Sequence, residues 1–159
     1  MGNTTVMTVC VTMKKATSLL LNHDLNTTTM NTPRVSREQA EGLKKVGYDV
    51  KCHANYECTK KEEKLIEYSI RENWNTDDTF GMRVRTSYFS APTLDEATRW
   101  LREVKGWHVA VDTTGMGWYL FCTEIKGGSV ILPTKNNFDT HELALSAGID
   151  LILKKLEER

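Results

Sequence analysis

The stretch from 107 to 123 constrains the fold most, because apolar and polar side chains alternate on both sides of a glycine-containing turn. This pattern predicts a β-hairpin. Successive side chains along a strand point to opposite faces of the sheet. With a loop of two or four residues, six side chains of the two strands therefore share one face, which is the expected core face: Trp107, Val109, Val111, Trp118, Leu120 and Cys122. Residues 129–132, after the turn at Gly127 and Gly128, can add a third strand.

Capping boxes on both sides of this hairpin predict helices. The first is Thr93-Leu94-Asp95-Glu96, and its helix should end at Gly106. The second is Asp139-Thr140-His141-Glu142, with Phe138 and Leu143 placed for a hydrophobic staple. Its helix should run to about residue 157 on one buried stripe: Leu145, Ile149, Ile152, Leu153 and Leu156.

The chain before residue 92 is expected to hold one more helix and further strands. Ser36-Arg37-Glu38-Gln39 is a capping box that predicts a helix over 37–46, ended by Gly47. Residues 60–73 could begin a helix after Thr59, but the alternation of Ile66, Tyr68 and Ile70 favours a hairpin. Residues 82–88 should be extended.

Together these elements predict a single α+β domain over 33–159, an antiparallel sheet with helices packed on one face and a helix, three strands, helix unit over 93–157. Residues 1–32 contain nine threonines and no aromatic residue. They predict a poorly ordered extension, with a strand around 6–11 as the alternative.

Residues 51–58 carry two cysteines and a histidine, which raises the question of a metal site. In a strand, Cys52, Ala54, Tyr56 and Cys58 share one face and His53 lies on the other. The two sulfurs would then be roughly 20 Å apart, whereas zinc ligands lie only ~2.0–2.3 Å from the metal. We therefore expect a buried apolar stripe and no metal. Nucleotide-binding loops and a catalytic nucleophile with a base are not recognisable either, so no catalytic residue or cofactor is assigned.

Composition argues against a few classes of function. The 21 basic and 21 acidic side chains balance, so no global field draws the chain to nucleic acid or to an anionic membrane. No apolar run approaches the ~20 residues of a membrane span. The four scattered cysteines favour a reducing compartment, so we expect a cytoplasmic protein.

One predicted surface merits attention as a binding site. His108, Tyr119 and Phe121 lie on the hairpin face opposite the core. Arg83 and Arg85 alternate on an extended stretch that also carries Tyr88. Aromatic side chains with nearby arginines can stack nucleotides or bases. The alternative is that another segment covers this face.

The chain resembles small uncharacterised proteins encoded by phages and prophages of gut anaerobic bacteria. The likeness rests on three stretches: SREQAEGLKKVGYDV at 36–50, YFSAPTLDEATRWLREVKGWHVAVD at 88–112 and FDTHELALSAGIDLILKKLEE at 138–158. It implies an accessory role inside an infected bacterium and transfers no site residues.

Three hypotheses about function follow. The first is a non-enzymatic protein that binds a host or phage protein, with inhibition of host defence as one role. The second is a nucleotide or nucleic-acid binder that uses the aromatic and arginine surface. The third is a hydrolase with an unrecognised site. A homo-oligomer stays open under each of them.

Overall fold

The computed structural model describes residues 32–78, 86–113, 115–133 and 137–159. The extension expected at 1–32 therefore lies outside the described residues, apart from Thr32. The elements, in chain order, are α1 (Arg37–Lys45), β1 (Cys52–Cys58), β2 (Glu63–Glu72), β3 (Asp77–Asp78), β4 (Thr86–Ser90), α2 (Leu94–Val104), β5 (Trp107–Thr113), β6 (Trp118–Glu124), β7 (Val130–Ile131) and α3 (His141–Glu157).

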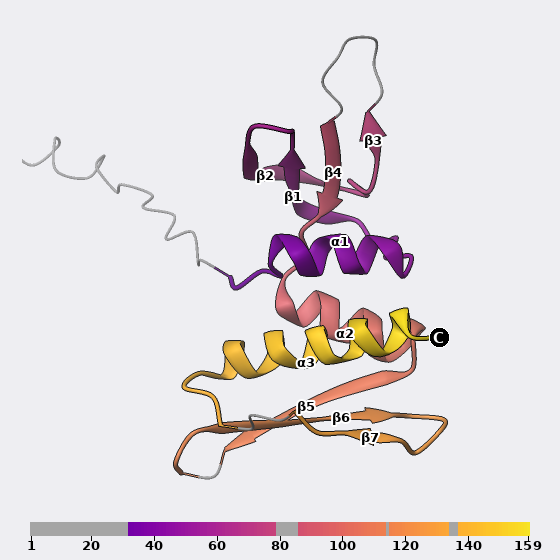
Figure 1. Cartoon of the computed structure of the whole chain (residues 1–159). Helices are drawn as coiled ribbons and strands as arrows, with labels where there is room; N and C mark the ends of the chain where they lie inside the picture. The colour runs from indigo at the N-terminus through magenta and orange to yellow at the C-terminus, as the bar shows by residue number, and fades with distance from the viewer. Residues whose placement is uncertain (1–31, 79–85, 114, 134–136) are drawn as a thin grey trace, which may run out of the picture. The chain divides into compact units, whose positions relative to one another are not determined.

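The strands form two antiparallel sheets, which confirms the α+β class but not the single sheet that the sequence predicted. One sheet has the strand order β2-β1-β4-β3 and the other has the order β5-β6-β7. Helix α1 packs against β4, α2 against β5, and α3 against β5, β6 and the other two helices. The helices thus lie between the sheets and cover one face of each (Figure 1). The predicted order helix, three strands, helix occurs from α2 to α3, although β7 has only two residues.

The first two capping boxes form as predicted. Ser36 Oγ accepts the N–H of Gln39, and Gln39 Oε1 accepts the N–H of Ser36. Thr93 and Glu96 make the same reciprocal pair at the start of α2. Each exchange satisfies two N–H groups that the first turn of a helix leaves without partners.

The third helix begins one residue later than the box predicts. Thr140 is the N-cap, and its side chain accepts the N–H of Leu143. The box based on Asp139 is therefore wrong. Phe138 exchanges two backbone hydrogen bonds with Trp118, which keeps the chain extended up to that point. Leu143, expected in a staple, is 53% exposed.

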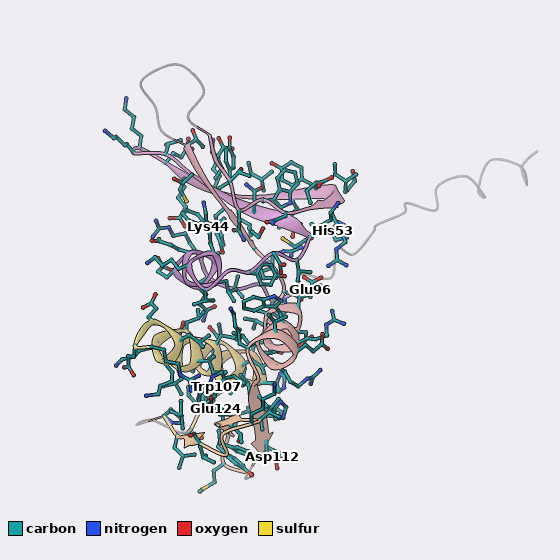
Figure 2. The ribbon with its side chains drawn as sticks, turned by 90° about the vertical axis from the view of Figure 1, so that its right-hand side faces the viewer. Lys44, His53, Glu96, Trp107, Asp112 and Glu124 are labelled. Carbon is teal, nitrogen blue, oxygen red and sulfur yellow. The ribbon has the colours of Figure 1, made fainter. Side chains whose placement is uncertain are left out.

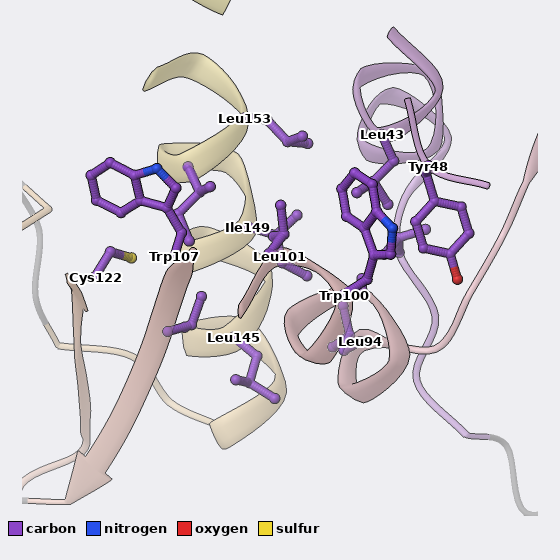
Figure 3. Packing of buried hydrophobic residues seen from close by; sticks show 14 of the residues in the cluster. Leu43, Tyr48, Leu94, Trp100, Leu101, Trp107, Cys122, Leu145, Ile149 and Leu153 are labelled. Carbon is purple, nitrogen blue, oxygen red and sulfur yellow. The ribbon is translucent and has the colours of Figure 1, made fainter. Parts of the chain in front are cut away.

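The hairpin of β5 and β6 has the predicted faces. Thr113 lies opposite Trp118, so the two strands are four residues apart in the sequence, and Val109 lies opposite Cys122. The core face meets α3, and Trp107, Leu120 and Cys122 on it are fully buried. Figure 3 shows Trp107 and Cys122 in this core. The stripe predicted for α3 is also buried, with only Leu156 partly exposed.

The four-stranded sheet confirms the hairpin interpretation of residues 60–73. The chain turns at Thr59, whose Oγ1 accepts the N–H groups of Lys61 and Glu62. Strand β1 then pairs with β2 on one side and with β4 on the other, where Asn55 lies opposite Ser90. The predicted stripe on β1 is buried at Cys52 and Ala54 and partly buried at its other end.

Candidate functional site

The candidate binding surface is the face of the β5-β6-β7 sheet that points away from the helices. We call it the outer face. The strand register places three cross-strand pairs on it, His108 with Thr123, Ala110 with Phe121 and Asp112 with Tyr119, and Val130 lies beside Thr123. None of these seven residues belongs to the hydrophobic core cluster. The helices that pack on β5 and β6, α2 and α3, lie on the opposite face (Figure 1).

The outer face combines aromatic rings with one carboxylate. His108 and Asp112 are exposed, Tyr119 and Phe121 are half-buried, and Val130 is 59% exposed. Ala110, the smallest side chain on this face, is the cross-strand neighbour of Phe121. Tyr119 Oη donates to Asp112 Oδ2 at 3.2 Å. The negative charge of Asp112 raises the pKa of Tyr119, which favours the protonated phenol that donates this hydrogen bond.

The structure does not bring all the predicted surface residues together. His108, Tyr119 and Phe121 share the outer face as predicted. Tyr88 lies in β4 opposite Glu57, in the other sheet. Arg83 and Arg85 lie outside the described residues. Figure 2 shows the separation of the two sheets, with His53 in one, Asp112 in the other and helices between them.

The cysteines and the histidine of residues 51–58 do not converge. Cys52 is buried and its Sγ donates to the Ala54 carbonyl at 3.0 Å, while His53 Nδ1 lies 3.2 Å from the Tyr68 carbonyl on the exposed side. Burial raises the pKa of the Cys52 thiol. Burial also raises the pKa of the Cys122 thiol, to about 11. Within the described ranges, no three His, Cys, Asp or Glu side chains gather as metal ligands.

Sequence reasoning missed an apolar groove beside α3. Two adjoining hollows of about 240 and 320 Å³ share Leu151 and Lys154. The smaller is also lined by Ile131, Lys155 and Glu158, and the larger by Pro133, Phe138, Ala147 and Asp150. The signal in the sequence is the spacing of Leu143, Ala147 and Leu151 at i, i+4 and i+8, which places a second apolar stripe on α3 outside the buried one.

Comparison with protein-family models, with curated proteins and with solved structures finds no match. The helices in the described part of the chain include none that is both long and apolar enough to cross a membrane.

Proposed function

We propose that the chain is a non-enzymatic binding protein whose partner is another protein, and that the outer face is the surface that binds it. The observation that carries this proposal is the position of Tyr119 and Phe121, half-buried on a sheet face that α2 and α3 leave uncovered. Aromatic side chains held on a rigid sheet are typical anchors of protein interfaces, because they bury a large area at a small cost in side-chain entropy.

The charges of the outer face favour a protein over a nucleic acid. Its seven described side chains include the carboxylate of Asp112 and neither lysine nor arginine. Nucleic-acid affinity comes largely from lysine and arginine side chains that neutralise phosphates, and a carboxylate opposes it. The partner that fits is an apolar protein segment that covers Phe121 and fills the space above Ala110. The resemblance to phage proteins would make this partner a host or phage protein, with inhibition of host defence as one role.

The thiols of Cys52 and Cys122 are not suited to covalent catalysis. A nucleophilic cysteine needs an accessible thiolate, which a lowered pKa provides. Cys52 and Cys122 are buried and their pKa values are raised, so both remain protonated thiols at neutral pH.

The test is affinity capture from a lysate of a gut anaerobe with three forms of the full chain. They are the wild type, Tyr119→Ala/Phe121→Ala and the control Leu65→Ala/Ile70→Ala. The control removes two apolar side chains that are 47% and 59% exposed on β2, in the other sheet. Thermal melts followed by circular dichroism check that each form is folded.

We expect the wild type and the control to retain one stoichiometric partner protein that the aromatic variant loses while it stays folded. Retention of that partner by the aromatic variant would contradict the proposal. Unfolding of the aromatic variant would contradict it as well, because the outer face would then be part of the core. Capture of nucleotide or nucleic acid, seen in the ratio of absorbance at 260 and 280 nm, would favour the second hypothesis instead.

A further inference from the structure

We propose that the apolar groove beside α3 binds a second copy of this chain, with the two α3 helices antiparallel across a two-fold axis. The groove shares no residue with the outer face, so this inference does not rest on the proposed function. It starts from an apolar stripe on α3 that the described residues cover only in part. Leu143 is exposed, Leu151 lies two turns further along and is partly buried, and Ala147, also partly buried, lies midway between them.

The groove exists because the sheet under α3 is narrow at one edge. Helix α3 has 17 residues and is about 25 Å long. The edge strand β7 has only two residues, Val130 and Ile131. The side of α3 that faces this edge therefore packs on few apolar side chains. The result is the pair of hollows lined by Ile131, Pro133, Phe138 and Leu151.

A two-fold axis beside Ala147 makes this surface self-complementary. In antiparallel helices that cross at residue 147, residue 143 of one copy lies opposite residue 151 of the other. Leu143 is 53% exposed, and it would enter the larger hollow, which Leu151 of the second copy lines. Ala147 stands at the crossing point, where a small side chain permits the closest approach of two helices.

The charges at the ends of the groove fit the same arrangement. With the axis at residue 147, Lys154 of one copy lies opposite residue 140 of the other, next to the exposed Asp139. Among the described residues, no ion-pair partner of Lys154 occurs within its own chain. The pairing of Lys154 with Asp139 is made twice, once on each side of the axis. An unrelated partner would have to match this charge pattern by chance, whereas a second copy matches it by symmetry.

The area of the groove surface determines how tightly two copies of the chain are expected to bind. A strip about 25 Å long and one helix wide falls at the low end of specific interfaces, below roughly 1,200 Å² in total, and such contacts are weak or transient. We therefore expect a reversible dimer with a Kd on the order of micromolar.

Sedimentation velocity of the full chain over a range of concentrations tests this inference. The wild type should shift reversibly from monomer to dimer. Leu143→Asp should raise the Kd by about tenfold or more, which corresponds to the loss of one apolar anchor at the interface. The matched control is Val104→Asp, which places the same charge at a 59% exposed apolar position near the end of α2.

Charge-reversal variants test whether Lys154 of one copy pairs with Asp139 of the other, as distinct from a general effect of polar side chains on the dimer. Lys154→Asp alone should weaken the dimer, because it brings two carboxylates together at each end of the groove. The double variant Asp139→Lys/Lys154→Asp should restore the dimer to within about threefold of the wild-type Kd, since exchanged charges attract as the original pair does. A chain that stays monomeric up to millimolar concentration would overturn the inference. So would a dimer that Leu143→Asp leaves intact, or a charge exchange that rescues nothing.

Discussion

The close approach of α3 to β5 at Gly148 leads to a specific prediction about this glycine. A Cβ atom added to Gly148 would lie 2.5 Å from Cγ1 and 3.3 Å from Cγ2 of Val109. Val109 is buried, and a β-branched side chain is stiff at χ1, so its methyl groups cannot turn away from the new Cβ atom without a cost in free energy. Gly148→Ala must therefore move α3 away from β5 or strain Val109.

Two opposing terms set the size of this effect. Alanine in a helix interior is favoured over glycine by about 1 kcal/mol. Overpacking of a core costs ~1–3 kcal/mol, and a clash with a stiff side chain belongs at the upper end of that range. We expect Gly148→Ala to lower the free energy of unfolding by about 2 kcal/mol after both terms are combined. Urea denaturation followed by tryptophan fluorescence measures it as a lower midpoint with an unchanged slope.

A glycine in another helix supplies the control. A Cβ atom on Gly42 would lie 2.9 Å from Cδ1 of Leu153, the far end of a side chain that can rotate. Helix propensity favours both alanine variants by about 1 kcal/mol. In Gly42→Ala this gain offsets the smaller cost of moving the end of Leu153, so this variant should be close to neutral. Val109→Ala should restore much of the stability of Gly148→Ala, with a coupling free energy of about 1–3 kcal/mol in a double-mutant cycle. A neutral or stabilising Gly148→Ala would refute this account of the packing.

Three further predictions concern a helix cap and the thiols. Thr93→Ala should lower the free energy of unfolding by about 1 kcal/mol, because it removes one half of a capping box, and an unchanged urea midpoint would contradict this. In a Cys10→Ser background, Ellman's reagent should modify the partly exposed Cys58 in the native protein and should modify Cys52 and Cys122 only after unfolding. Burial raises the pKa of the Cys122 thiol from 9.0 to about 11. The stabilisation that the buried, protonated thiol provides is therefore complete below pH 9, and it is lost as the pH rises towards 11 because the unfolded chain releases the proton first. Melting temperatures of the wild type and Cys122→Ala should converge over that range.

Local signals in the sequence predict the helices and the hairpin well, because each depends on neighbours along the chain. The capping boxes at Ser36 and Thr93 form because the residues that exchange the hydrogen bonds are only three apart. The third box fails for a non-local reason. Both Asp139 and Thr140 are good N-cap residues. The backbone pairing of Phe138 with Trp118 in β6 decides between them, and no pattern around residue 139 contains that information.

For the same reason, the sequence does not predict which strands belong to the same sheet. Alternation tells which side chains share a face of one strand, but it does not name the neighbouring strand. Pairing of β1 with β4 joins Cys58 to Ser87 across 28 intervening residues. Buried polar groups follow from such pairings too. Asn55 is fully buried beside Ser90, although its position in the alternation is that of the exposed His53.

Because the sequence does not predict which strands pair, the predicted binding surface combined residues that lie in two different sheets. The parity of β5 and β6 placed His108, Tyr119 and Phe121 on one face, and the register confirms it. Adding Tyr88 to them required β4 to join the same sheet. Instead the chain leaves β4 through α2 and begins a second sheet at β5, so the helices separate Tyr88 from Phe121 (Figure 1). A ligand that stacks on Phe121 must therefore find its other contacts on β5, β6 and β7. Among the described residues of the outer face, Asp112 carries a charge and no lysine or arginine is present. This is why we propose a protein partner for this face in preference to a phosphate-bearing ligand.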